Sequence, residues 1–353
     1  MTTLIDLASD TLTSPSAGMR AFMARAPVGD EQRQEDPSVN ALQERVAALL
    51  GKEAALYLPS ATMANAIAVK THTRPGDEVV LERTAHIVTS EAGGTALLSG
   101  AMVYVIDGVR GVFTEQQVVD AIRRDDPHCA RTRLVCVEQT SNQGGGTVWP
   151  VARLHAVAEA AHRHGLRTHM DGARVMNAAV ASGIPAAEHA RGYDSVTFCL
   201  TKGLGCPVGA LLAGERAFIT EARRYKHMFG GAMRQAGIIA AAGLYALDHN
   251  VERLAQDHTH AKILARGLAE IPGIAIDVAH VETNLVFFDV AGTGLTAKEA
   301  VERLLARGVR MGATGRTRIR AVTHMDVSQQ DVERAVEIAR EVWGRARAGA
   351  PGE

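Results

Sequence analysis

The sequence predicts an α/β fold, with a large domain built on a mainly parallel sheet and a small C-terminal α+β domain. Two observations support this expectation. Short β-branched or apolar segments alternate with helical stretches between residues 54 and 212. Aromatic residues make up only 4% of the chain, while alanine, glycine and valine are abundant, and this composition favours close packing of helices on a sheet.

The expected strands of the large domain are short and are separated by helical stretches. They are Ala54–Leu58, Glu78–Leu81, Met102–Ile106, Leu134–Val137, Leu166–Met170, Ser195–Leu200 and Val208–Leu212. The clearest helix is Val151–His164, where apolar residues recur on one face and Gly165 provides the stop. Strands that alternate with helices of this kind form parallel sheets covered on both faces, and ligands bind at the carboxyl ends of their strands.

A change of spacing near Asn250 predicts a second, smaller domain. The expected elements there follow a helix over Ala232–Asp248 and are helix Ala261–Ala269, strand Asn284–Asp289, helix Ala297–Arg307, strand Arg318–Val322 and helix Gln330–Arg345. We therefore expect residues 1–249 to form an N-terminal arm and a large domain, and residues 250–353 to form the small domain. The final AGAPGE is the only tail that we expect.

The composition indicates which kinds of molecule the protein binds. The 353 residues include 38 Lys and Arg against 39 Asp and Glu, which gives no electrostatic reason to expect nucleic acid or an anionic membrane. The four cysteines lack C-x-x-C or zinc-finger spacing, so neither disulfides nor a metal site is expected. A signal-peptide pattern and a membrane-length apolar run are also lacking. These features predict a cytoplasmic protein that acts on a small molecule.

An acid and a lysine follow two of the predicted strands. Asp171 comes at the end of Leu166–Met170, and Lys202 comes after Ser195–Leu200, so both should lie at one edge of a parallel sheet. Taken alone, such a pair is more simply an ion pair. However, Lys202 has only small neighbours in the run TKGLGCP, and this leaves room for a flat cofactor joined to the lysine as an imine.

Pyridoxal 5′-phosphate (PLP) needs such an amine, a carboxylate at its pyridine nitrogen, donors for its phosphate and a flat group against its ring. Lys202 and Asp171 meet the first two needs. The segment PSATMAN follows a strand and opens a helix, so Ser60 and its neighbours could bind phosphate, although Ser60 could equally be an ordinary helix cap.

The histidines are harder to assign from the sequence. His86 follows the strand Glu78–Leu81 and could stack on the ring or act as an acid or base, although most isolated histidines are surface or packing residues. His155, His162 and His164 lie in or at the end of a helix and receive no role. The same caution applies to His169.

Several motifs, spread from about Ile5 to Ser328, resemble one known family. They are DLASDTLTSP, VGDEQRQEDPSVNALQ, GKEAALYLPSATMAN, HTRPGDEV, EAGG with LSG, HMDGARVMNAA, CLTKGLGCPVG, GGAMRQAG and RIRAVTHMDVS. In this order and spacing, the chain resembles the L-threonine aldolase family of the low-specificity type. These are fold-type-I PLP enzymes, related in fold to aspartate aminotransferase.

The resemblance implies a role for each matching residue. It makes Lys202 the Schiff-base lysine and Asp171 the partner of the pyridine nitrogen, with His86 stacked on the ring. The expected cofactor site also contains Ser60, Ala61, Thr62, Arg174 and Arg234, the last at a subunit boundary. The expected substrate-binding residues are Ser9, Arg174 and Arg320, which would hold the carboxylate, together with Ser141 and Arg33.

The implied reaction is retro-aldol cleavage of a β-hydroxy-α-amino acid, of the threonine or allo-threonine type, to glycine and an aldehyde. The resemblance also implies a homodimer or homotetramer. The alternatives are a related PLP enzyme (a β-eliminating lyase, racemase or transaldolase) and a non-catalytic homologue.

The chain departs from the family pattern at a few positions. Ser141 stands where the family usually has a histidine that contacts the substrate hydroxyl, so proton removal would pass to His86 or to water. Arg33-Gln34 replaces Tyr-Gly, and Arg33 would favour a polar or anionic substrate side chain or would be a surface residue. The milder departures are Ala8 for arginine, and Ala61 and Ala232 for glycine.

Overall fold

The computed structural model describes residues 4–344, which form two compact units. One unit contains residues 15–251, and the other contains residues 4–14 with residues 252–344. The N-terminal segment thus differs from the expected division, which placed it with the large domain. It joins the C-terminal unit because β1 (Ile5–Asp6) pairs with β10 (Val309–Arg310). The expected AGAPGE tail and the helix end at Arg345 lie outside the described residues.

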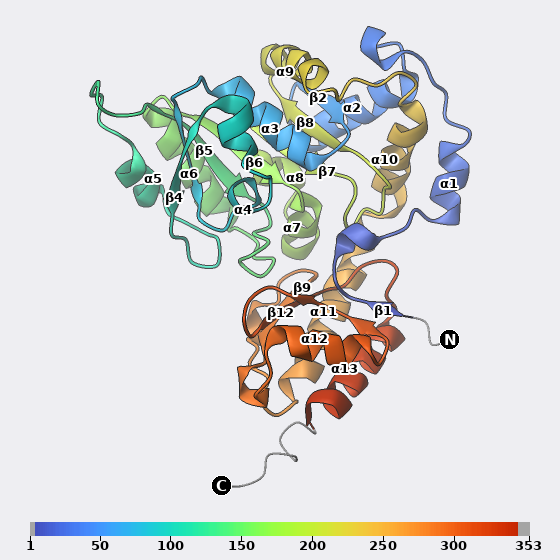
Figure 1. Cartoon of the computed structure of the whole chain (residues 1–353). Helices are drawn as coiled ribbons and strands as arrows, with labels where there is room; N and C mark the ends of the chain where they lie inside the picture. The colour runs from blue at the N-terminus through green and yellow to red at the C-terminus, as the bar shows by residue number, and fades with distance from the viewer. Residues whose placement is uncertain (1–3, 345–353) are drawn as a thin grey trace. The chain divides into compact units, whose positions relative to one another are not determined.

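The larger unit is built around a seven-stranded sheet with the order β2-β8-β7-β6-β5-β3-β4 (Figure 1). Its strands are β2 (Ala54–Leu58), β3 (Glu78–Glu82), β4 (Met102–Ile106), β5 (Thr132–Glu138), β6 (Arg167–Gly172), β7 (Ser195–Cys199) and β8 (Ala210–Gly214). Neighbouring strands from β7 to β4 are parallel, and β8 runs against both of its neighbours. The predicted α/β fold with a mainly parallel sheet is confirmed.

Helices cover both faces of this sheet. His169 on β6 contacts Asn65 of α3 (Ala61–His72), whereas the adjacent Thr168 contacts His162 of α6 (Val151–Arg163). Because successive residues of a strand point to opposite faces, α3 and α6 lie on opposite faces of the sheet. The other helices of this unit are α1 (Ala17–Met23), α2 (Pro37–Leu49), α4 (His86–Thr89), α5 (Glu115–Ala121), α7 (Val175–Ser182), α8 (Ala186–Ala190), α9 (Arg216–Met228) and α10 (Gly237–His249).

The start of α10 shows where local sequence misled the prediction. The helix was expected from Ala232 but begins at Gly237, whose N–H donates to Oδ2 of Asp36 at 2.8 Å. The N–H of Met233 instead donates to Oε2 of Glu31 at 3.2 Å. Residues 232–236 are therefore used to bind the segment around residues 30–36, a contact that sequence periodicity does not reveal.

The C-terminal unit is a small α+β unit, as predicted. Its three-stranded antiparallel sheet has the order β11-β12-β9, with β9 (Leu285–Asp289), β11 (Gly312–Ala313) and β12 (Arg318–Val322). Three helices pack around a common core: α11 (Leu254–Ala269), α12 (Ala297–Leu305) and α13 (Gln329–Gly344). Leu7 anchors the N-terminal segment here, because its N–H donates to Arg310 O and its carbonyl accepts from Val322 N, both at 2.8 Å.

Within residues 4–344, none of the helices combines the length and the apolar character that crossing a bilayer requires.

Candidate active site

Neighbouring parallel strands of the large sheet end at one edge, and the candidate residues lie at these ends. Asp171 lies near the end of β6, and Lys202 follows β7. Glu138 is the last residue of β5 and pairs in register with Asp171. His86 follows β3 and begins α4. The acid, the lysine and the histidine singled out in the sequence thus share the carboxyl edge of the sheet, where α/β proteins bind ligands.

Asp171 is only 2% exposed and lies in a cluster of polar groups. Its Oδ2 accepts from Nδ2 of Asn65 at 2.8 Å, and its Oδ1 accepts from the N–H of Ala173 at 3.1 Å. Ring-nitrogen or carboxylate-oxygen atoms of His86, Glu91 and Asp171 lie within 4.8 Å of one another. This spacing would also accept a cation, although hydrogen bonds with His86 and Asn65 already occupy the Glu91 carboxylate.

His86 is held by Glu91, and its Nδ1 lies 2.8 Å from Oε1 of that carboxylate. This hydrogen bond is the main reason why the pKa of His86 is raised, and the negative charge of Asp171 adds to it, whereas burial and Lys202 oppose it. Burial also raises the pKa of Glu91. With Nδ1–H donated to Glu91, Nε2 is the nitrogen of His86 that can take up a proton.

Glu138 connects His86 to the loop that carries Ser141. Its carboxylate accepts from the N–H of His86 at 2.5 Å and from the N–H of Asn142 at 2.6 Å. Burial, with the neighbouring charge of Asp171, raises the pKa of Glu138 to about 7. Its role in the structure is to hold two backbone segments at the carboxyl edge of the sheet.

Lys202 lies in a tight turn beside a small hollow. The N–H of Gly205 donates to Lys202 O at 2.8 Å, and Gly205 has a φ of 73°, which a glycine adopts without strain. The hollow is lined by Lys202 together with residues 172–177 and Phe198. Arg174 is part of this lining and is 6% exposed. Of the small residues around Lys202, Gly203 also lines this hollow, and room for a flat cofactor beside the lysine stays a prediction.

The segment expected to bind phosphate begins helix α3. Ser60 is the N-cap of this helix, and its Oγ accepts from the N–H of Met63 at 3.1 Å, so the capping role is confirmed. Ala61 and Thr62 form the first turn, where backbone N–H groups have no partner within the helix. Ser60 and Thr62 are exposed, so the turn is accessible to an anion. Binding of phosphate by these residues stays a prediction.

The residues expected to hold the substrate carboxylate belong to both units. Arg174 lies in the larger unit, whereas Ser9 and Arg320 lie in the C-terminal unit. Within that unit, Arg320 Nη2 donates to Ala8 O at 3.2 Å, and Ser9 Oγ accepts from Thr11 N at 3.2 Å.

Ser141, one of the departures from the family pattern, lies in a tightly packed loop. It is buried, and its Oγ accepts from the N–H of Gly144 at 3.3 Å. A Cβ added to Gly111 would lie 1.9 Å from this Oγ, so the serine packs directly against Gly111. The segments 138–142 and 108–112 are therefore adjacent at the end of β5.

Arg33 and Arg234 both lie in the larger unit, in segments joined by a backbone hydrogen bond. Arg33 is an exposed residue at the end of the 3₁₀ turn Glu31–Arg33. Arg234 is exposed and pairs with Asp30 at 2.8 Å, and its carbonyl accepts from the N–H of Glu31. The two arginines thus belong to neighbouring segments that pack against each other.

Three residues of the polar cluster were not singled out in the sequence: Asn65, Glu91 and Glu138. Glu138 had a visible signal, because it follows the predicted strand Leu134–Val137 as Asp171 follows Leu166–Met170. Asn65 and Glu91 lie within the quoted motifs PSATMAN and EAGG, but no local pattern shows that their side chains meet Asp171 or His86.

Comparison with known proteins identifies the family. A family model described as beta-eliminating lyase matches residues 6–292. The chain belongs to this family. It is 43% identical over 330 residues to the low specificity L-threonine aldolase of Escherichia coli K12, across 93% of this chain and 96% of that protein. It is 39% identical over 333 residues to low-specificity L-threonine aldolase 1 of Arabidopsis thaliana, across 93% of each.

The fold of this lyase-family chain also matches solved structures. The threonine aldolase of Leishmania major superposes with a TM-score of 0.81 at 22% identity and covers 96% of this chain and 99% of that one. The predicted relationship to low-specificity L-threonine aldolases and the predicted fold-type-I architecture are thus confirmed.

Proposed function

We propose that the chain is a PLP-dependent aldolase that cleaves a β-hydroxy-α-amino acid, of the threonine or allo-threonine type, to glycine and an aldehyde. The observation that carries the proposal is the placement of His86, Asp171 and Lys202 at one carboxyl edge of the sheet. Relatives named low-specificity L-threonine aldolase, which align with 93% of the chain, support the choice of reaction.

The residues at this edge fit PLP. A lysine, a buried carboxylate and a capped helix N-terminus provide the amine, the acid and the anion donors that the cofactor needs. Thr197 pairs in register with Asp171, and its buried hydroxyl has no hydrogen-bond partner within residues 4–344. A buried hydroxyl without a hydrogen-bond partner lowers the stability of the fold by about 1–3 kcal/mol. A polar group bound over this part of the sheet would remove that cost.

In the proposed reaction, Lys202 holds the cofactor through its amine, and Asp171 holds a proton on the pyridine nitrogen. When bound, PLP supplies an acceptor for the electron pair that is released as the Cα–Cβ bond breaks. Ser60, Ala61 and Thr62 bind the phosphate with backbone N–H groups and hydroxyls.

His86 is the residue that we assign to the proton of the substrate β-hydroxyl. Its raised pKa makes it a stronger base than an ordinary histidine, because Glu91 stabilises the imidazolium. Nε2 accepts the proton while Nδ1 stays bonded to Glu91. Ser141 can donate or accept a hydrogen bond, but it does not replace a base near neutral pH.

Substrate orientation falls to Arg174, Arg320 and Ser9. A guanidinium fork matches the two oxygens of a carboxylate, so arginine is well suited to hold an amino acid by this group. By fixing the carboxylate, these residues would set the orientation of the substrate and so determine which bond of Cα is cleaved. We assign Arg33 to a polar group on the substrate side chain, in keeping with its exposure.

We also propose a homodimer or homotetramer in the cytoplasm. Arg234 is exposed in the single chain, so a second copy can contact it. The ion pair with Asp30 holds its guanidinium in place. In an assembly of this kind, Arg234 would approach the phosphate bound by the neighbouring copy. Sedimentation that shows an active monomer would contradict this part of the proposal.

A second candidate is β-elimination, which the description of the matching family model favours. It uses the same cofactor and the same lysine but breaks a bond at Cβ. The products separate the two reactions, because an aldolase releases glycine and an aldehyde in equal amounts, whereas elimination releases a keto acid and ammonia.

The test is reduction of the PLP-loaded protein with borohydride, followed by peptide mass analysis and a product assay with a panel of β-hydroxy amino acids. We expect the added mass on Lys202 and equal amounts of glycine and aldehyde. Lys202→Ala should abolish both, and Lys298→Ala, which removes an exposed lysine of α12, should change neither. A wild-type protein that takes up no PLP would overturn the proposal.

A further inference from the structure

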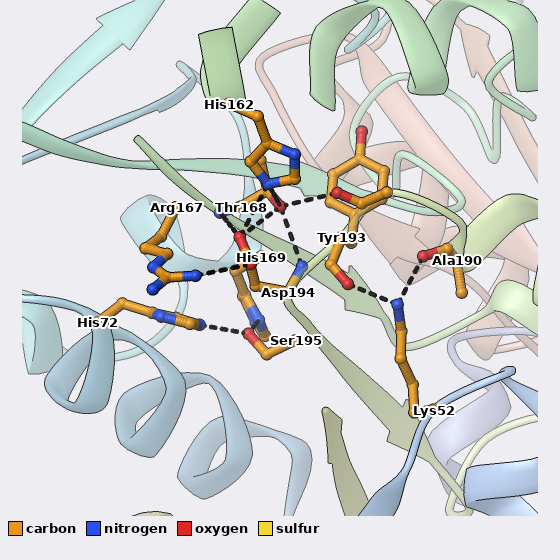
Figure 2. A network of polar contacts seen from close by, with 11 residues as sticks. Lys52, His72, His162, Arg167, Thr168, His169, Ala190, Tyr193, Asp194 and Ser195 are labelled. Atoms are coloured by element: carbon orange, nitrogen blue, oxygen red, sulfur yellow. Dashed lines mark hydrogen bonds and ion pairs between the residues drawn. The ribbon is translucent and has the colours of Figure 1, made fainter. Parts of the chain in front are cut away.

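A chain of polar side chains runs behind Asp171. It begins with Asn65 Nδ2, which donates to Asp171 Oδ2 at 2.8 Å. Asn65 Oδ1 lies 3.1 Å from His169 Nε2, and His169 Nδ1 lies 2.8 Å from Ser195 Oγ. The last member is His72, whose Nε2 lies 2.8 Å from Ser195 Oγ. Figure 2 shows the part from His72 through Ser195 to His169. We call these five residues the His72–Asp171 chain.

The secondary structure explains why these residues meet. Asn65 and His72 both lie on α3 and are separated by about two helical turns, so they share one face of the helix. His169 and Asp171 are alternate residues of β6 and therefore point to the same face of the sheet. Ser195 on β7 is the register partner of His169. The facing sides of one helix and two strands thus supply the whole chain.

The donor and acceptor of each hydrogen bond in the chain can be assigned by starting from Asn65, the residue next to Asp171. The side-chain amide of Asn65 lies 2.8 Å from Oε1 of Glu91 and 2.8 Å from Oδ2 of Asp171. Two carboxylate oxygens need donors, so the NH₂ group of Asn65 faces them and Oδ1 is left as an acceptor. Oδ1 then requires a donor, which is Nε2–H of His169.

The remaining tautomers are determined in turn. Burial lowers the pKa of His169 to about 4 and that of His72 to about 3, so both rings are neutral near neutral pH. A neutral His169 that donates from Nε2 must accept at Nδ1, and Ser195 supplies that proton. The lone pairs of Ser195 Oγ then accept from Nε2–H of His72. Each residue of the chain therefore donates a hydrogen bond to the next one toward Asp171, and the second N–H of Asn65 donates to Glu91.

The opposite face of the same strands provides a comparison. Thr168, the neighbour of His169 on β6, bonds to Asp194 Oδ2 at 3.0 Å and lies 3.3 Å from His162 Nε2 (Figure 2). This second network joins β6 to α6 and the start of β7. Its side chains point away from Asp171 because adjacent strand residues alternate between faces.

We propose that the His72–Asp171 chain positions the Asp171 carboxylate for the pyridine nitrogen, with Asn65 and His169 as positioning residues. This inference rests on the proposed function. A carboxylate that accepts from a side chain locked by a further partner loses rotational freedom, so its geometry is set before the cofactor binds. Helix α3 also carries the phosphate-binding turn at Ser60, so one helix positions the groups for both ends of the cofactor.

The test compares the full-length wild-type protein with four variants. His169→Leu removes the donor to Asn65, whereas His169→Gln keeps one donor and one acceptor. Thr168→Val breaks the network on the opposite face of the same strand and is the matched control. Ser195→Ala, which breaks the chain one residue farther from Asp171, replaces His169→Leu if that variant does not fold.

Two readouts report on the cofactor independently of turnover. The first is the dissociation constant of PLP measured on the apoprotein. The second is the ¹⁵N chemical shift of the pyridine nitrogen in protein loaded with ¹⁵N-labelled PLP, which reports whether that nitrogen is protonated.

We expect His169→Leu to weaken PLP binding about tenfold, in line with the loss of one hydrogen bond that supports a charged group. The ¹⁵N shift should move toward the unprotonated value. Ser195→Ala should act in the same direction by a factor of about three, while His169→Gln and Thr168→Val stay within twofold of the wild type. If His169→Leu matches Thr168→Val in both readouts while the wild type binds PLP and cleaves substrate, the positioning role is wrong and the proposed function stands. If the wild type does not bind PLP on Lys202, the proposed function itself fails.

Discussion

The ion pair between Lys226 and Glu31 is buried, and this burial determines how much stability we expect the protein to lose when the pair is broken. Lys226 on α9 is 1% exposed, and its Nζ lies 2.5 Å from Oε1 of Glu31. The other oxygen of Glu31 accepts from the N–H of Met233 at 3.2 Å. Burial lowers the pKa of Lys226, because the ammonium has lost its water. The pair joins α9 to the segments 30–36 and 231–237.

Lys226→Met should lower the free energy of unfolding by about 3–5 kcal/mol, because Glu31 is left as a buried charge without its cation. The double variant Lys226→Met with Glu31→Gln should recover about 2 kcal/mol or more of that loss, since the amide oxygen can still accept from Met233 without a charge. The recovery measures the penalty of the unpaired charge, separately from the packing lost with the lysine.

The assay is urea unfolding of the wild type, both single variants and the double variant, followed by far-UV circular dichroism. Lys298→Met, which removes the cation of an exposed pair on α12, is the control and should leave the midpoint unchanged. The reasoning about the buried charge is refuted if the stability losses of the two single variants add up in the double variant. It is also refuted if Lys226→Met leaves the urea midpoint unchanged, as the control does.

Two further predictions concern pH and the cap of α3. The folded pKa of His169 is lowered to about 4 against an ordinary value of 6.5, so the unfolded chain takes up this proton first as the pH falls. The contribution of His169 to stability is present above pH 6.5 and is lost as the pH falls toward 4. Between pH 7 and 5 this loss amounts to about 2 kcal/mol. His169→Gln should remove this part of the pH dependence, and parallel stability curves for the two proteins would contradict it. Ser60→Ala should cost about 1 kcal/mol through the lost cap. PLP binding should weaken as well if Ser60 also binds phosphate, and unchanged affinity would leave Ser60 as a cap only.

The alternation of strands and helices could be predicted well because it depends on local patterns. Ala54–Leu58, Met102–Ile106 and Arg318–Val322 have the same bounds in the structure as in the prediction. The errors lie where a distant partner decides the end of an element. Strand β8 begins at Ala210 rather than Val208, after Gly209 with its φ of 117°.

The candidate site divides in the same way. Asp171, Lys202 and His86 could be found because each follows a predicted strand, and parallel strands end at a common edge. Asn65 and Glu91 could not be found, because they reach the site from a helix and a loop whose placement over the sheet is not encoded in any local spacing. His169 was noticed but left without a role for the same reason.

By itself, the sequence determined the α/β class, the family, and the acid, lysine and histidine at the strand ends, because periodicity, composition and motif spacing are properties of the chain. Only the tertiary structure decided which side chains support these groups and which segment belongs to which unit. Residues 4–14 pack with residues 252–344 through the β1–β10 pair and further hydrogen bonds such as that of Leu7 with Val322. Asn65 meets Asp171 because α3 crosses β6. Such contacts join residues far apart in the chain, and their free energy depends on distance and burial, which no stretch of sequence carries alone.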